Sequence, residues 1–212
     1  MKKVVIIDCG GNILSLRRAI SKFNFEANVT IDHEEIKKAS HIFLPGVGAF
    51  KKAMGILEKN KLINLLTSLD FTKSNLLGIC LGMQILLQNG KEDGFCEGLG
   101  LIKGSVEKIE LSESDKIKNL KIPNIGWHNL NKKNHSWDNT ILENLELEEN
   151  CYFVHSYYAN LSDKNDCLSH INYGSLELPA VIKKNKIYGC QFHPEKSGEI
   201  GLNIIKKFLE LE

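Results

Sequence analysis

A cysteine between two glycines is the strongest chemical signal in this sequence. Cys80 is the middle residue of the segment GICLG (78–82), which follows an apolar run and precedes a helix-like stretch. A strand that turns sharply into a helix presents the residue at the turn above the sheet, and flanking glycines leave room for the tight backbone. The N–H groups at the start of a helix also favour the thiolate form of a cysteine. The pattern therefore predicts a cysteine nucleophile at residue 80.

A base for this nucleophile is available in the segment QFHPE (191–195). Residues two apart in an extended segment project to the same side, so we expect Glu195 to lie beside the ring of His193. The carboxylate would orient the imidazole and stabilise it when it is protonated. Because parallel strands gather their active sites at their carboxyl ends, we expect Cys80, His193 and Glu195 to form a catalytic triad.

Attack of a thiolate on a carbonyl group also requires donors for the developing oxyanion, each worth roughly 3 kcal/mol. The N–H group of Leu81, the residue after the nucleophile, is the expected first donor. The segment PGVG (45–48) follows a neighbouring predicted strand, and we expect Val47 to supply the second. Its neighbouring glycines allow the peptide plane to take the required orientation.

Each of these motifs also has a purely structural explanation. A cysteine between glycines is more often a buried structural thiol, a histidine two residues before an acid arises freely at strand ends, and PGVG is usually a turn. All three fall where one doubly wound sheet would bring them together, which favours the catalytic interpretation.

The first ninety residues supply the sheet that would position them. Short β-branched runs alternate with helical patterns. Strands are predicted at 3–8, 27–31, 41–44 and 75–79, and helices at 12–23 and 34–39. The proline and glycine at 45–46 are expected to end the strand that begins at 41, and helices are expected to follow up to about residue 69. This alternation predicts a parallel sheet covered by helices on both faces.

After residue 100 the pattern becomes mostly β. Strands are predicted at 105–111, 151–159, 167–173, 179–183 and 186–192, with a hairpin turn at 184–185 and loops at 112–119 and 131–139. A closing amphipathic helix is predicted after the serine and glycine at 197–198, through residue 208. No linker or repeat interrupts the chain. We therefore expect one α/β domain over residues 1–212, with an antiparallel extension in its C-terminal half.

Composition excludes several classes of protein. Apolar residues make up 42% and charged residues 25% of the chain, values that are ordinary for a globular protein. With 27 Lys and Arg against 26 Asp and Glu, the net charge of +1 provides no basic field for nucleic acid. No stretch approaches the ~20 apolar residues of a membrane span. The N-terminal apolar run ends at Asp8, which favours a strand over a signal peptide, and we expect a cytoplasmic protein.

The cysteines give no sign of a metal or disulfide framework. The chain has six cysteines without a Cys-x-x-Cys pair or a zinc-like spacing. We therefore expect no metal and no cofactor, and five of the six cysteines are expected to be ordinary buried or partly exposed thiols.

In these motifs the chain resembles the class I glutamine amidotransferases and, among them, the glutaminase subunits of imidazole glycerol phosphate synthase. The similarity runs nearly end to end and is most specific in LPGVG (44–48), LGICLGMQ (77–84), FVHSYY (153–158) and QFHPEKSG (191–198). The resemblance implies a flavodoxin-like, mostly parallel sheet flanked by helices. It also implies that Cys80 attacks the side-chain amide of L-glutamine, that a thioester forms, and that ammonia and L-glutamate are released.

The resemblance also implies a set of substrate-binding residues. Positions that match those holding glutamine in the family are Gly48, Gln84, Glu92, Ser156 and Tyr157. Plainer interpretations exist for three of them: Gln84 as an early helix residue, Glu92 as a surface charge and Tyr157 as a core aromatic.

A partner is implied as well. The family member docks as a heterodimer on a (β/α)8-barrel cyclase subunit, which takes the ammonia through an internal tunnel. The products are imidazole glycerol phosphate and an aminoimidazole carboxamide ribotide, in histidine biosynthesis.

Two segments depart from the family pattern. The first loop, DCGGNILS (8–15), is about one residue short. In PNIGWHN (123–129), Asn124 and His128 stand where the family usually has histidine and asparagine, near its partner-facing side. These departures leave open a paralogous subunit that feeds ammonia to an enzyme amidating a surface sugar.

Two alternatives come from other classes of protein. A non-catalytic interaction subunit is disfavoured because all three triad positions are filled. A cysteine peptidase is disfavoured because Gln84 and Tyr157 match a pocket for a small amino acid.

Overall fold

The computed structural model describes residues 2–133, 136–146 and 149–212, and its centre is an eight-stranded sheet of order β2-β1-β3-β4-β14-β13-β12-β9. The first five of these strands are parallel. Four of them lie in the first ninety residues, as the sequence predicts: β2 (Ala27–Val29), β1 (Val4–Ile6), β3 (His41–Gly46) and β4 (Asn75–Cys80). The fifth, β14 (Ile187–Cys190), comes from the C-terminal half and pairs with β4. The other three are antiparallel: β13 (Leu176–Lys184), β12 (Cys167–Tyr173) and β9 (Asn131–Lys132). The expected hairpin joins β13 to β14, with its turn at residues 185–186 rather than 184–185 because Lys184 still pairs with Ile187.

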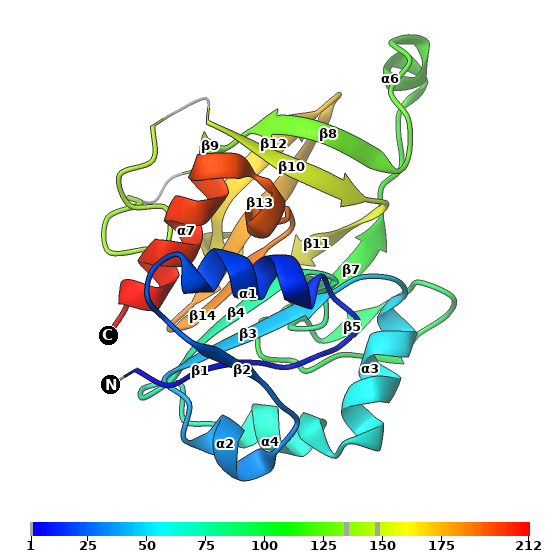
Figure 1. Cartoon of the computed structure of the whole chain (residues 1–212). Helices are drawn as coiled ribbons and strands as arrows, with labels where there is room; N and C mark the ends of the chain where they lie inside the picture. Colours follow the sequence, from blue (N-terminus) through cyan, green and yellow to red (C-terminus); the bar gives the residue numbers. More distant parts are fainter. Residues whose placement is uncertain (1, 134–135, 147–148) are drawn as a thin grey trace.

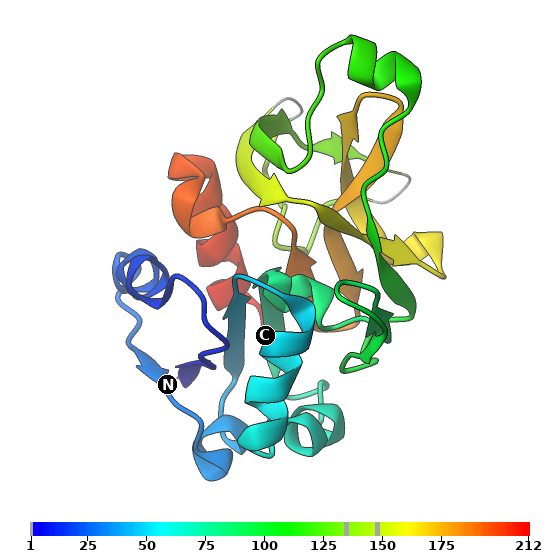
Figure 2. The same ribbon diagram turned by 90° about the vertical axis from the view of Figure 1, so that its right-hand side faces the viewer.

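Helices cover both faces of the parallel part of the sheet (Figures 1 and 2). One face carries α1 (Ile13–Ser21) and α7 (Gly198–Glu210), and the other carries α2 (His33–Lys37), α3 (Phe50–Lys59) and α4 (Leu62–Ser68). Successive side chains of a strand point to opposite faces. In β1, Val4 and Ile6 accordingly join the cluster beneath α1 and α7, whereas Val5 joins the other cluster.

Residues 89–161 add two smaller sheets (Figure 1). One pairs β10 (Asn150–His155) with β8 (Asn124–Asn129), and the other has the order β11 (Tyr157–Leu161), β7 (Gly104–Lys108), β5 (Asn89–Gly90) and β6 (Cys96–Glu97). The short helix α6 (Glu113–Ile117) projects away from the body, and a 3₁₀ turn, η1 (Lys164–Asp166), precedes β12. The antiparallel extension is thus confirmed.

Several predicted boundaries are wrong for identifiable reasons. Strand β3 continues through Pro45. Its neighbour β1 ends at Ile6, which pairs with Phe43, so no residue of β1 lies opposite Pro45 to accept the N–H group that proline lacks. The predicted strand 151–159 is two strands, β10 and β11, which part at Ser156 and join different sheets.

The predicted loops also contain regular structure. The segment 112–119 holds α6, which begins with a capping box between Ser112 and Asp115. The segment 131–139 begins with β9, and its residues 134–135 lie outside the described part of the chain. Of the helices described here, none has the length and apolarity needed to cross a membrane.

Candidate active site

The backbone at Cys80 is strained. Cys80 ends β4 and precedes the single helical turn α5 (Leu81–Gln84), with φ 55° and ψ −112°, a conformation that residues with a side chain rarely adopt. A Cβ at Gly82 would lie 1.6 Å from the carbonyl oxygen of Leu44, and one at Gly78 would lie 2.6 Å from the carbonyl oxygen of Gly82. Both glycines are therefore required for the sharp turn from strand to helix that the sequence predicts.

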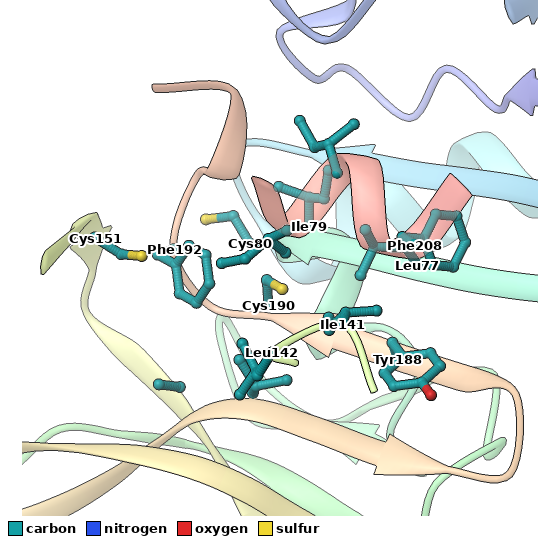
Figure 3. Packing of buried hydrophobic residues seen from close by; sticks show 14 of the residues in the cluster. Leu77, Ile79, Cys80, Ile141, Leu142, Cys151, Tyr188, Cys190, Phe192 and Phe208 are labelled. Atoms are coloured by element: carbon teal, nitrogen blue, oxygen red, sulfur yellow. The ribbon is translucent and has the colours of Figure 1, made fainter. Parts of the chain in front are cut away.

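The sulfur of Cys80 lies at the boundary between the core and a cavity. Its residue is 8% exposed, and Figure 3 shows it at the rim of the buried cluster, near Phe192 and Cys190. The side-chain Nε2 of Gln191 donates to Sγ at 3.8 Å, and Sγ lies 3.9 Å from the carbonyl oxygen of Val154. Val154 on β10 and Gln191, the residue after β14, thus fix the position of the sulfur.

The other cysteines are poorly suited to be nucleophiles. Burial raises the pKa of Cys151 to about 12, and burial together with Asp8 does the same for Cys9. Burial raises the pKa of Cys190 well above its usual range, and it also raises the pKa values of Cys96 and Cys167. These five thiols remain protonated near neutral pH, whereas Cys80 is the cysteine that lines the cavity.

His193 and Glu195 form a buried pair behind this cavity. His193 Nδ1 lies 2.9 Å from Glu195 Oε1, and both side chains are 3% exposed. Burial alone would lower the pKa of His193, but its interactions with Cys80 and Glu195 prevail and raise that pKa to about 9. The imidazole is therefore protonated at neutral pH, beside the sulfur that it would assist.

The route by which Glu195 reaches His193 differs from the expectation. The segment is a 3₁₀ turn, η2 (Pro194–Lys196), rather than an extended strand, because proline is favoured at the first position of a helical turn. Glu195 Oε2 is buried and has no hydrogen-bond partner among the described residues, so the side-chain hydrogen bond of this carboxylate goes to His193.

Strand β10 holds the turn in place. The N–H group of His193 donates to the carbonyl oxygen of Tyr152 at 3.0 Å. The hydroxyl of Ser197 donates to the carbonyl oxygen of His193 at 2.7 Å and accepts the N–H group of Tyr152 at 3.0 Å. The imidazole is thus fixed by its backbone as well as by its carboxylate partner.

A cavity of about 490 Å³ opens in front of Cys80 and His193. The predicted oxyanion and substrate residues all line it: Val47, Gly48, Leu81, Gln84, Glu92, Ser156 and Tyr157. The third triad residue, Glu195, lies behind His193 and does not line the cavity. The structure therefore brings the predicted residues to one place.

The contacts of Gln84 and Glu92 go beyond the plainer interpretations of these residues. Gln84 is buried, and its Nε2 donates to the carbonyl oxygen of Tyr157 and to Gln191 Oε1, both at 3.1 Å. Glu92 Oε2 accepts the N–H group of Phe50, the first residue of α3, at 2.7 Å. Glu92 therefore both caps a helix and contributes a carboxylate to the cavity.

Sequence reasoning missed several residues of the site. Ala49, Pro123, Val154 and His155 also line the cavity, and Gln191 contacts the sulfur. His155 and Gln191 stand inside the quoted motifs FVHSYY and QFHPEKSG, so the signal was present. Their roles depend on contacts between distant strands, which no local pattern contains.

The two departures in the segment 123–129 point inward. Asn124 is fully buried, and its side chain contacts both His128 and His155, whereas Ile125 and Trp127 between them are 59% and 55% exposed. The described residues contain no group of three or more His, Cys, Asp or Glu side chains placed to hold a metal ion.

The chain matches a known protein family over nearly its whole length. The model of the family described as glutamine amidotransferase class-I matches residues 5–211. The chain is 44% identical to the imidazole glycerol phosphate synthase subunit HisH of Lactococcus lactis, with 99% of each chain covered. It is 42% identical to HisH 1 of Legionella pneumophila strain Lens, with 100% of each covered, and 41% identical to HisH of a Geobacillus species, with 97% and 95% covered.

Solved structures show the same fold at lower identity. A crystal structure of a glutamine amidotransferase superposes with a TM-score of 0.73 at 16% identity, covering 98% of this chain and 97% of that one. The structure of PurLQS from Thermotoga maritima gives 0.71 at 20% identity, with 99% and 98% covered. The chain therefore belongs to the class I glutamine amidotransferase family and, within it, to the HisH subunits of imidazole glycerol phosphate synthase.

Proposed function

We propose that this chain is the glutaminase subunit of an imidazole glycerol phosphate synthase and that Cys80, His193 and Glu195 are its catalytic triad. The observation that carries the proposal is the cavity in which the sulfur of Cys80 and the protonated imidazole of His193 meet, with Glu195 2.9 Å behind the imidazole. A thiolate and an imidazolium side by side are the reactants that amide cleavage by a cysteine requires.

The reaction proceeds in two halves. The thiolate of Cys80 attacks the side-chain amide carbon of glutamine, and the imidazolium of His193 gives its proton to the departing nitrogen, so that ammonia leaves and a glutamyl thioester remains. His193 then takes a proton from water, which attacks the thioester and releases glutamate and the thiolate. Glu195 keeps the ring oriented and stabilises its charged form.

The oxyanion of each half-reaction is assigned to two backbone donors. Leu81 is the first residue of α5, so its N–H group has no partner within that helix. Val47 also lines the cavity and precedes Gly48, whose φ of +96° reflects the unusual backbone of this loop. Residues Gly48, Gln84, Glu92, Ser156 and Tyr157 hold the substrate.

The ammonia is proposed to pass to a (β/α)8-barrel cyclase subunit in a heterodimer. Ammonia released into water at neutral pH becomes ammonium and is no longer a nucleophile, so a closed path between subunits is required. Exposed apolar side chains are available for docking: Val47, which lines the cavity and is 48% exposed, and Ile125 and Trp127 on β8. As a subunit of histidine biosynthesis the chain is expected in the cytoplasm and to act as one domain over residues 1–212.

Purified chain incubated with glutamine, alone and with its barrel partner, tests this proposal. We expect weak release of glutamate alone, strong activation in the complex and complete loss in Cys80→Ala. The variant His193→Ala should lose activity while the complex still forms. Appreciable turnover by Cys80→Ala would overturn the nucleophile assignment, and failure to rescue a histidine auxotroph together with the barrel partner would overturn the pathway.

A further inference from the structure

A chain of side-chain hydrogen bonds runs from β8 to the wall of the cavity. His128 Nε2 lies 2.7 Å from Asn124 Oδ1, and Asn124 Nδ2 lies 3.0 Å from His155 Nε2. His155 Nδ1 in turn lies 2.8 Å from the carbonyl oxygen of Tyr157. Asn124 is fully buried and His155 is 6% exposed, so water does not compete for these bonds.

The positions of the protons along these hydrogen bonds follow from the carbonyl oxygen of Tyr157, which can only accept. The carbonyl oxygen of Tyr157 accepts, so His155 carries its proton on Nδ1 and presents a bare Nε2 to the amide of Asn124. The NH₂ group of Asn124 donates to that nitrogen. The Oδ1 atom of Asn124 therefore faces His128 and accepts its N–H group. Each contact then joins one donor to one acceptor, with His155 neutral.

The same carbonyl group belongs to the substrate site. The carbonyl oxygen of Tyr157 also accepts a hydrogen bond from Gln84, and Gln84 donates to Gln191, which donates to the sulfur of Cys80. The state of His155 therefore affects an acceptor that also fixes Gln84, a residue of the cavity wall.

We propose that Asn124 is a positioning residue of the glutaminase site: its amide holds His155 neutral, with the proton on Nδ1, and so keeps the Tyr157 carbonyl in place for Gln84. The inference rests on the proposed function, since it assigns Asn124 a part in that site. It also explains how one segment can differ from the family pattern at two positions, because Asn124 and His128 contact each other directly.

The charges around His155 support the assignment. Burial outweighs the opposing effect of the Tyr157 carbonyl and, with smaller contributions from the nearby His128 and His193, lowers the pKa of His155 to about 4. The titratable groups around it are His128 from β8 and His193 from the turn after β14, with Cys80, Glu92 and the Tyr157 hydroxyl lining the same cavity. A neutral His155 leaves His193 as the protonated histidine of the cavity.

The variant Asn124→Asp tests this assignment without reference to activity. A carboxylate offers His155 Nε2 an acceptor where the amide offers a donor, so the ring should bind a second proton. In a pH titration of the ¹⁵N-labelled full chain without glutamine, we expect His155 to carry two ring protons at about pH 6 in the variant and one in the parent. The control Asn129→Asp, which adds the same charge on an exposed residue of the same strand, should leave His155 unchanged.

Two further variants connect the assignment to the reaction. Asn124→Leu should lower kcat/KM for glutamine by about 10- to 100-fold, mainly through KM, because no donor then holds the proton of His155 on Nδ1, facing the Tyr157 carbonyl that fixes Gln84. The exchange variant carries both Asn124→His and His128→Asn and keeps a donor toward His155. Its kcat/KM should therefore stay within about threefold of the parent value.

Specific outcomes would overturn the proposal. The first is that His155 stays neutral in Asn124→Asp. The second is that His155 gains the same proton in the control Asn129→Asp. The third is that kcat/KM is unchanged in Asn124→Leu. A parent chain without glutaminase activity would instead refute the proposed function, while the titration would still report on the contact between Asn124 and His155. If Asn124→Leu does not fold, the titration and the exchange variant still decide.

Discussion

The side-chain amide of Gln191 donates to the sulfur of Cys80 at 3.8 Å, while its oxygen accepts a hydrogen bond from Gln84 at 3.1 Å. Because the oxygen is already engaged, the NH₂ group is the part of the amide that faces the sulfur. A donor in this place stabilises negative charge on sulfur and holds it above the turn.

Gln191→Leu should therefore weaken the nucleophile. A hydrogen bond to a charged group contributes roughly 1.5–3 kcal/mol, so we expect kcat to fall by about 10- to 100-fold. Alkylation of Cys80 by iodoacetamide, followed by mass spectrometry, should slow in parallel. Gln88→Leu is the matched control, because Gln88 accepts the N–H group of Gly104 and does not line the cavity; equal effects of the two variants would contradict the assignment.

Glu195→Gln should lower the pKa of His193. The carboxylate is one of the two groups that raise this pKa to about 9, and an amide of the same shape lacks its charge. We expect glutamate release to decline less than in Cys80→Ala, because the ring can still be oriented by a hydrogen bond. Titration of the His193 ring by NMR measures the effect, with Glu199→Gln on the exposed start of α7 as control; an unchanged His193 would show that Glu195 is not its electrostatic partner.

Two glycine substitutions should have opposite effects on stability. Gly82→Ala would place a Cβ 1.6 Å from the carbonyl oxygen of Leu44 and should destabilise the fold by several kcal/mol, roughly as overpacking does at its upper end. In Gly55→Ala, on helix α3, the added Cβ has no neighbour within 4 Å, so the free energy of unfolding should rise by up to about 1 kcal/mol. Urea denaturation of both variants checks the contrast, which would be refuted if Gly82→Ala unfolded at the same urea concentration as the parent.

Acid should destabilise the fold in part through His41. Burial, with a smaller effect of Lys2, lowers the pKa of His41 to about 4, below the value of about 6.5 in an unfolded chain. The unfolded state therefore binds the proton first as the pH falls, and the stabilising effect of a neutral His41 is lost between about pH 6.5 and 4.

From pH 7 to pH 5 this loss amounts to about 2 kcal/mol. In His41→Gln the fall in unfolding free energy over this interval should shrink by that amount, as measured by urea denaturation at the two pH values. His33→Gln serves as control, since His33 is half-buried and its ring contacts the carbonyl oxygen of Asn60. An identical pH dependence in parent and His41→Gln would refute the explanation.

The sequence was most informative where chemistry depends on local backbone. The glycines around Cys80 predicted the sharp turn because only a missing Cβ fits against Leu44. The parallel strands followed from their apolar runs, since such strands are buried on both faces. The spacing of His193 and Glu195 suggested their pairing, although the turn that achieves it is helical rather than extended.

The sequence was least informative where several strands meet. Strand β8 begins with Asn124 and contains Gly126, residue types that are depleted in strands, so its pattern gave no strand signal. The roles of His155 and Gln191 depend on contacts with residues 31 and 111 positions away. Such contacts arise only when the sheets assemble, and local periodicity does not contain them.

The central claim is that glutamine is cleaved through a thioester on Cys80. The most direct test is to mix the chain and its barrel partner with glutamine, quench in acid during turnover, and locate the adduct by peptide mass spectrometry. We predict one glutamyl group on the peptide that contains Cys80 and none in Cys80→Ala. Ammonia release without that adduct, or with a glutamyl group on another cysteine, would contradict the account.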